Sequence, residues 1–213
     1  MEQKIKFTKW NIFLLCLFLL SGITAKADIL PGKDYRIVPI APLAKSHEII
    51  PVTEFFWYDC PHCYAIENNL VKWSAKLPKD IKFTHIPSPI GNWKPMANLY
   101  YTLHAMGYGD KFRKDIFNAT QVQKLVLENP ETLSRWLISH GINPATYNEV
   151  SQSFGVQARI NQARQLALQY GIFEVPSFIV DNQYVTNLTL AKGDEKRLFY
   201  ILNSLIAKAR SER

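Results

Sequence analysis

Two cysteines separated by two residues are the part of this sequence best suited to chemistry. They form the segment Cys60-Pro61-His62-Cys63, and an apolar run ending at Tyr58 comes just before them. Four kinds of site use this spacing: structural zinc sites, c-type haem attachment sites, static disulfides and redox-active dithiols. The surrounding residues distinguish between these four.

The neighbouring residues argue against the first three kinds of site. A structural zinc ion needs four ligands, and the sequence has no second cysteine pair or His-x-His cluster to complete such a set. Haem attachment needs a histidine directly after the second cysteine, where this chain has Tyr64. A static disulfide is disfavoured because a two-residue loop is strained and its sulfur would lie at a helix tip. The pattern therefore favours a redox-active dithiol that needs no metal and no other cofactor.

The residues around the dithiol predict a strand followed by a helix. Residues 49–58 are rich in β-favouring types, which predicts a buried strand. After Pro61, which is tolerated in a first helical turn, the apolar residues have helical spacing: Ala65, Ile66, Leu70, Val71 and Trp73. Cys60 would then lie at the helix N-terminus, where free amides and the helix dipole favour the thiolate. We expect Pro61 and His62 to tune the redox chemistry, the latter through its positive charge when protonated.

These residues also resemble a known family. Glu54-Phe55-Phe56, Cys60-Pro61-His62-Cys63-Tyr64 and the downstream Val175-Pro176-Ser177 closely resemble the DsbA family of periplasmic thiol:disulfide oxidoreductases. The resemblance spans essentially the whole chain after residue 27. It implies an α/β protein with a thioredoxin fold and an inserted helical domain. For the exchange reaction we expect an exposed Cys60 that is attacked by substrate and a buried Cys63 that resolves the intermediate.

Two further parts of the site follow from the resemblance. In the family the proline matching Pro176 has a cis peptide bond and faces the dithiol, which implies that the backbone of Val175 lies beside Cys60, free to pair with an extended substrate. Glu54 lies in an apolar run, where a carboxylate is costly to bury unless it is paired or protonated. The family pairs this acid with a lysine, but the matching position here holds His85. We therefore expect Glu54 to contact His85 and this pair to tune the dithiol.

The first 27 residues predict a secretory signal peptide. Lysines precede an apolar core, and Ala25-Lys26-Ala27 is a small-x-small cleavage site before Asp28. An uncleaved anchor is the alternative, although the apolar core is short for a membrane span. Cleavage leaves 186 residues as one domain with Cys60 and Cys63 as its only cysteines, and the net charge falls from +7 to +4. Because the basic residues are scattered, the sequence gives no indication of nucleic-acid binding.

The remaining pattern predicts that the 28–213 domain is interrupted by helices. The resemblance places this helical insertion at about 93–171, and Asp110, Asn129 and Asn143 are candidate helix caps within it. Asp181-Asn182 indicates a two-residue hairpin turn, and the strand after the dithiol helix should lie parallel to the strand before it. The predicted strands are 35–38, 81–86, 175–180 and 183–185, and the predicted helices are 95–106, 110–119, 130–141, one from 144, 154–170 and 194–209.

Three functions are compatible with these features. The resemblance implies a monomeric dithiol oxidase that donates the Cys60–Cys63 disulfide to reduced, unfolded exported proteins in the periplasm. A DsbB-like, quinone-linked membrane oxidase would then reoxidise it. A reductase or isomerase on the same fold is the second; the family's isomerases carry a preceding dimerisation domain, for which only about 20 residues are available after Asp28. The third is a peptide-binding chaperone in which the dithiol is incidental.

Overall fold

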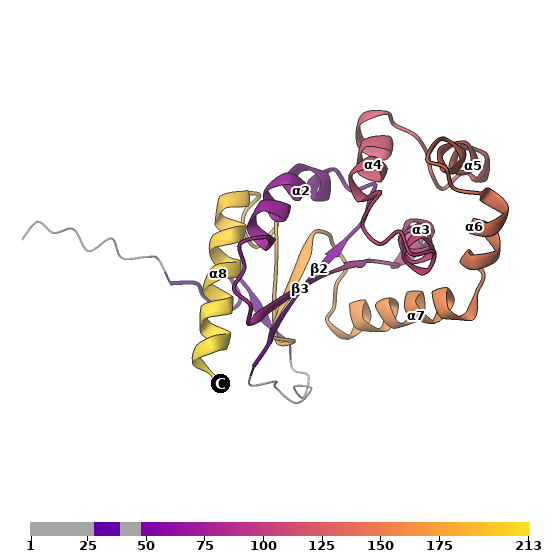
Figure 1. The fold of residues 1–213 in the computed structure, drawn as a ribbon. Helices are drawn as coiled ribbons and strands as arrows, with labels where there is room; N and C mark the ends of the chain where they lie inside the picture. Colours follow the sequence, from indigo (N-terminus) through magenta and orange to yellow (C-terminus); the bar gives the residue numbers. More distant parts are fainter. Residues whose placement is uncertain (1–27, 39–47) are drawn as a thin grey trace, which may run out of the picture.

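A five-stranded sheet lies at the centre of the computed structural model, which describes residues 28–38 and 48–213 (Figure 1). The strand order is β1-β5-β4-β2-β3. Strand β2 runs parallel to β3, as predicted, and antiparallel to β4, and β5 runs antiparallel to both β4 and β1. The strands are β1 Arg36–Ile37, β2 Ile50–Phe56, β3 Ile81–Pro87, β4 Ser177–Val180 and β5 Tyr184–Asn187.

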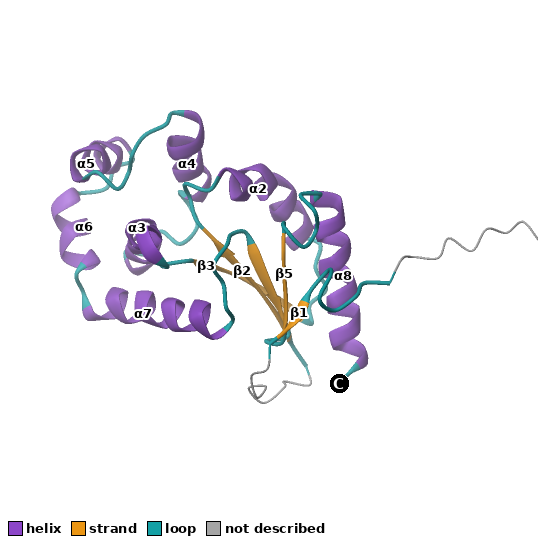
Figure 2. Ribbon diagram, turned by 180° about the vertical axis from the view of Figure 1, so that it is seen from behind, coloured by secondary structure: helices purple, strands orange, loops and turns teal. Residues whose placement is uncertain are grey.

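Strand β2 lies in the interior of the sheet, between β4 and β3, because it is apolar on both faces. Its residues Val52 and Phe55 point to opposite faces, and both are fully buried. The helices α2 (Pro61–Ser74) and α8 (Glu195–Ser211) share a core with Val52, whereas the end of α7 (Phe154–Gln169) shares a core with Phe55. Figure 2 shows α2 and α8 together on one side of the sheet and α7 on the other. The dithiol helix therefore packs directly on this interior strand.

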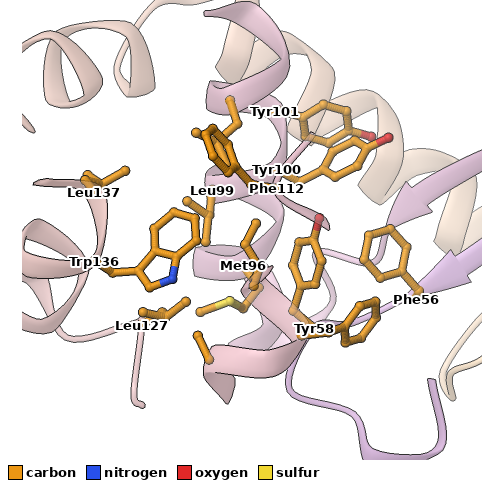
Figure 3. Packing of buried hydrophobic residues seen from close by; sticks show 14 of the residues in the cluster. Phe56, Tyr58, Met96, Leu99, Tyr100, Tyr101, Phe112, Leu127, Trp136 and Leu137 are labelled. Carbon is orange, nitrogen blue, oxygen red and sulfur yellow. The ribbon is translucent and has the colours of Figure 1, made fainter. Parts of the chain in front are cut away.

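The helices that follow β3 and precede β4 in the chain form a lobe beside the sheet (Figure 1). Met96, Leu99 and Trp136 pack within this lobe (Figure 3). Phe56 and Tyr58, from the end of β2 and the turn after it, belong to the same apolar cluster, so the lobe packs onto the segment that leads to the dithiol. The remaining elements of the lobe are η2 Gly91–Trp93, α3 Lys94–Ala105, α4 Arg113–Phe117, η3 Asn118–Val122, α5 Pro130–Ser139 and α6 Pro144–Ser151.

The helix caps agree with the sequence in two cases and differ in one. Asn129 and Asn143 accept hydrogen bonds from the first amides of α5 and α6, as predicted. The prediction that Asp110 caps a helix running over 110–119 is wrong. The helix begins at Arg113, because the Asp110 carboxylate bonds instead to the imidazole of His104 at 3.3 Å. A π-helical turn then continues the chain to residue 122.

The last hairpin has a longer turn than the sequence predicts. Asp181 and Asn182 do adopt the left-handed conformation, with φ of 54° and 56°. The strand residues that pair closest to the turn are Val180 and Tyr184, so three residues rather than two connect β4 to β5. In the described part of the chain no helix is long and apolar enough to cross a membrane. The predicted signal peptide lies outside these residues.

Candidate active site

The two cysteines lie at the start of α2, where the sequence places them. Cys60 is the N-cap residue, and its Sγ accepts a hydrogen bond from the backbone N–H of Cys63 at 3.5 Å. The Cys60 thiol also donates to the carbonyl oxygen of Val175 at 3.4 Å. Cys63 is fully buried, as predicted, but Cys60 is only 6% exposed. The expectation of an exposed Cys60 is therefore wrong: Cys60 is more exposed than Cys63 but still buried, because the Val175 loop lies against its sulfur.

The surroundings shift the pKa values of the two thiols in opposite directions. A hydrogen bond from the Cys63 side chain lowers the pKa of Cys60 to about 6, and the backbone amides of Cys63 and His62 and the charge of His62 add to this against the effect of burial. Burial raises the pKa of Cys63, and its bond to Cys60 and the charge of Glu54 act the same way. At neutral pH one proton is therefore lost from Cys60 and the other stays on Cys63.

The remaining predicted groups at the mouth of the site lie where the sequence suggests. Pro61 and His62 form the exposed first turn of α2. The Val175–Pro176 peptide bond is cis, as expected, and Pro176 is buried. Within the described ranges the N–H of Val175 has no hydrogen-bond acceptor. A backbone donor beside the Cys60 sulfur is thus available to an extended chain.

The predicted contact between Glu54 and His85 is present beneath the dithiol. The two residues pair across β2 and β3, and the His85 Nδ1 lies 2.6 Å from the Glu54 Oε2. Glu54 is completely buried, and no hydrogen-bond partner is found for its Oε1 within the described residues. Its charge reaches Cys63, the buried thiol.

A buried arginine completes this site, and the sequence did not reveal it. Arg113 donates from Nη2 to Glu54 at 3.2 Å, and from Nε and Nη2 to Glu67 of α2 at 2.7 and 2.8 Å. Its guanidinium lies 4.1 Å from the ring centre of Phe56. Burial lowers the pKa of Arg113, but the charge of Glu54 and the bond to Glu67 outweigh this and raise it. The sequence indicates only that a buried Glu54 needs a partner. It does not identify Arg113, which lies 59 residues away in the chain, as that partner.

A groove of about 400 Å³ opens beside the dithiol. His62 lines one side, Glu174, Val175 and Pro176 line another, and residues that follow β5 complete it. Val175 belongs both to this groove and to the hydrogen bond with Cys60, so the groove leads to the reactive sulfur. The larger cavity of about 690 Å³ lies in the helical lobe and contains none of the predicted site residues.

Comparisons with known proteins agree with this geometry. A family model described as a DSBA-like thioredoxin domain matches residues 51–193. The thiol:disulfide interchange protein DsbA of Azotobacter vinelandii is 36% identical over 187 residues, which are 87% of this chain and 86% of that protein. The protein of the same name from Pseudomonas aeruginosa is 32% identical over 204 residues, 93% and 94% of the two chains. The crystal structure of Pseudomonas aeruginosa DsbA superposes with a TM-score of 0.78 at 30% identity and covers 87% of this chain and 96% of that one.

Proposed function

Because the chain belongs to the DsbA family and is a thiol:disulfide oxidoreductase, we propose that Cys60 and Cys63 are its catalytic pair and that it oxidises newly exported proteins in the periplasm. The observation that carries this proposal is the contrast between the two thiols. Cys60 caps a helix with a pKa of about 6, whereas Cys63 is buried with a raised pKa. This contrast gives the two cysteines different roles.

The reaction consists of two exchanges. A thiolate of the reduced substrate attacks the Sγ of Cys60; a bond forms between the two sulfurs, the Cys60–Cys63 bond breaks, and Cys63 leaves with the electron pair and takes up a proton. The second thiolate of the same substrate then attacks the substrate sulfur of this mixed disulfide. The substrate disulfide forms and Cys60 leaves as a thiolate. The substrate loses two electrons, and the dithiol gains them.

The low pKa of Cys60 favours this direction for two reasons. A thiol of low pKa is a better leaving group, so the second exchange is fast. The thiolate is also stabilised in the folded, reduced protein, and stabilising the reduced form makes the disulfide a stronger oxidant. At pH 7 a pKa of about 6 leaves about nine-tenths of Cys60 as thiolate.

The groups around the pair have supporting roles in this proposal. Pro61 and His62 shape the first turn of α2 and act on the Cys60 thiolate. Glu54, held by His85, places a negative charge near Cys63 and keeps that thiol protonated. Val175 and Pro176 line the groove, and the backbone of Val175 can pair with a substrate chain that lies along it. A quinone-linked membrane oxidase of the DsbB kind, acting on the reduced monomer, would restore the disulfide.

The test uses two cysteine variants and a reduced model substrate with two thiols. The oxidised protein should convert the substrate to its disulfide in stoichiometric amount, and Cys60→Ser should abolish this. With a substrate in which one of the two cysteines is replaced by serine, Cys63→Ser should trap the mixed disulfide when it is first activated at Cys60 with a thiol reagent. Undiminished oxidation by Cys60→Ser would contradict the proposal. Gel filtration separates the oxidase from an isomerase, for which a dimer is expected.

A further inference from the structure

The groove beside Cys60 combines an apolar surface with one fixed carboxylate, and His62 and Thr189 are its other polar lining residues. Val175, Pro176 and Leu188 supply its apolar surface, and among the described residues that line it Glu174 is the only acid. Glu174 is exposed and lies one residue before Val175, whose carbonyl oxygen is 3.4 Å from the Cys60 Sγ. A substrate chain joined to Cys60 and laid along Val175 must therefore pass this carboxylate.

Neutral donors hold Glu174 in place. Asn187 donates to its Oε1 at 2.6 Å, and Thr189 donates to its Oε2 at 2.6 Å. Asn187 is itself buried and accepts a hydrogen bond from the N–H of Leu190 at 2.8 Å. Because both donors are uncharged, they orient the carboxylate without neutralising it. The groove thus presents a preorganised negative charge.

The nearby cations do not pair with this carboxylate. Arg36 acts on Glu174 through space, but its guanidinium donates to the backbone carbonyls of Tyr170 and Gly171. Asp59 is a second acid, directly before Cys60 in the chain, and the charge of Lys124 acts on it. The chain as a whole carries a net charge of +7, so the Glu174 carboxylate is opposite in sign to the overall charge. Local rather than global charge should therefore control which segments approach.

We propose that Glu174 gives this protein a preference for substrate cysteines with a lysine or arginine one or two positions away. The inference rests on the proposed function, since it concerns the same exchange at Cys60. An extended chain advances about 3.3 Å per residue. A substrate side chain one or two positions from the cysteine bonded to Cys60 is therefore carried past Val175 to Glu174. Opposite charge at this point speeds the encounter and stabilises the mixed disulfide, whereas a substrate acid is repelled.

The experiment compares two reduced dithiol peptides that differ only in having lysine or glutamate beside the reacting cysteine. Second-order rate constants for their oxidation are measured at low ionic strength and pH 8. The wild-type protein should oxidise the lysine peptide about threefold to tenfold faster. Glu174→Gln should bring the two rates within about twofold, and Glu174→Lys should reverse their order.

A matched control removes an acid far from the groove. Glu149→Gln, on the exposed side of α6, changes the net charge by the same amount and should leave the preference intact. Raising the salt concentration should weaken the preference of the wild-type protein, a check that requires no variant. Equal rates for the two wild-type reactions, or a preference that Glu174→Gln does not reduce, would overturn the inference while leaving the oxidase intact. Failure to oxidise either peptide would overturn the proposed function as well.

Discussion

Removing the buried arginine should destabilise the protein strongly. In Arg113→Met, Glu67 loses two hydrogen bonds of 2.7 and 2.8 Å, and Glu54 keeps only His85. Arg113 is 6% exposed and Glu54 is fully buried, so water cannot replace the guanidinium without rearrangement. Breaking a buried ion pair from one side costs about 3–5 kcal/mol, since the partner charge stays buried. We expect a loss of that size in the free energy of unfolding.

Urea unfolding of the reduced protein measures this loss as a fall in midpoint at an unchanged slope. Arg135→Met is the matched control, because Arg135 pairs with Glu131 on the surface, where the two side chains are 67% and 79% exposed. That variant should lose less than about 0.5 kcal/mol. Arg113→Lys keeps the charge without the two-pronged geometry and should fall between the two. If Arg113→Met lost no more than about 1 kcal/mol, the two carboxylates would not depend on this cation and our description of the buried network would be refuted.

Two further predictions concern the dithiol and the pair beneath it. The pKa of Cys60 is lowered from about 8.5 in the unfolded chain to about 6, so its stabilisation of the reduced fold is complete above pH 8.5, is about 1.4 kcal/mol at pH 7, and is lost as the pH falls through 6. Thiolate absorbance should show a midpoint near 6 that disappears in Cys60→Ser; a midpoint above 8 would contradict the assigned thiolate. His85→Ala removes the 2.6 Å bond to buried Glu54 and should cost about 1–3 kcal/mol of unfolding free energy, measured in urea, whereas an unchanged value would mean that this bond contributes nothing.

Local patterns in the sequence were sufficient to predict most of the strands and helices, whereas the insertion of a helical domain into a thioredoxin fold was predicted from the resemblance to the DsbA family. The apolar run before Cys60 and the helical spacing after it define a strand and a helix, and the crossover length makes β2 and β3 parallel. The Glu54–His85 contact was predicted from the resemblance to the DsbA family, in which the matching acid pairs with a residue of the neighbouring strand. The observed register, which places Glu54 opposite His85 in β2 and β3, accounts for it.

The contacts made by the helical lobe could not be predicted in this way. Arg113 reaches Glu54 and Glu67 only because the lobe folds back over the end of β2, and no periodicity encodes that arrangement. The burial of Cys60 has a similar origin, since Val175 covers it from a loop 115 residues away. The position of Asp110 predicts a helix cap, but its carboxylate bonds instead to His104 at the end of the preceding helix. In each case a contact between different elements overrode or completed a local signal.

The equilibrium reduction potential of the Cys60–Cys63 pair tests the central claim most directly. It should be measured in glutathione buffers at pH 7 on the chain from Asp28 onward. A thiolate stabilised by about 1.4 kcal/mol alone raises the potential of a two-electron couple by about 30 mV. We predict a potential well above the value of about −270 mV for thioredoxin, as a disulfide donor requires. A potential at or below that value would mean that the protein is a reductant and would contradict the oxidase function, although the fold would stand.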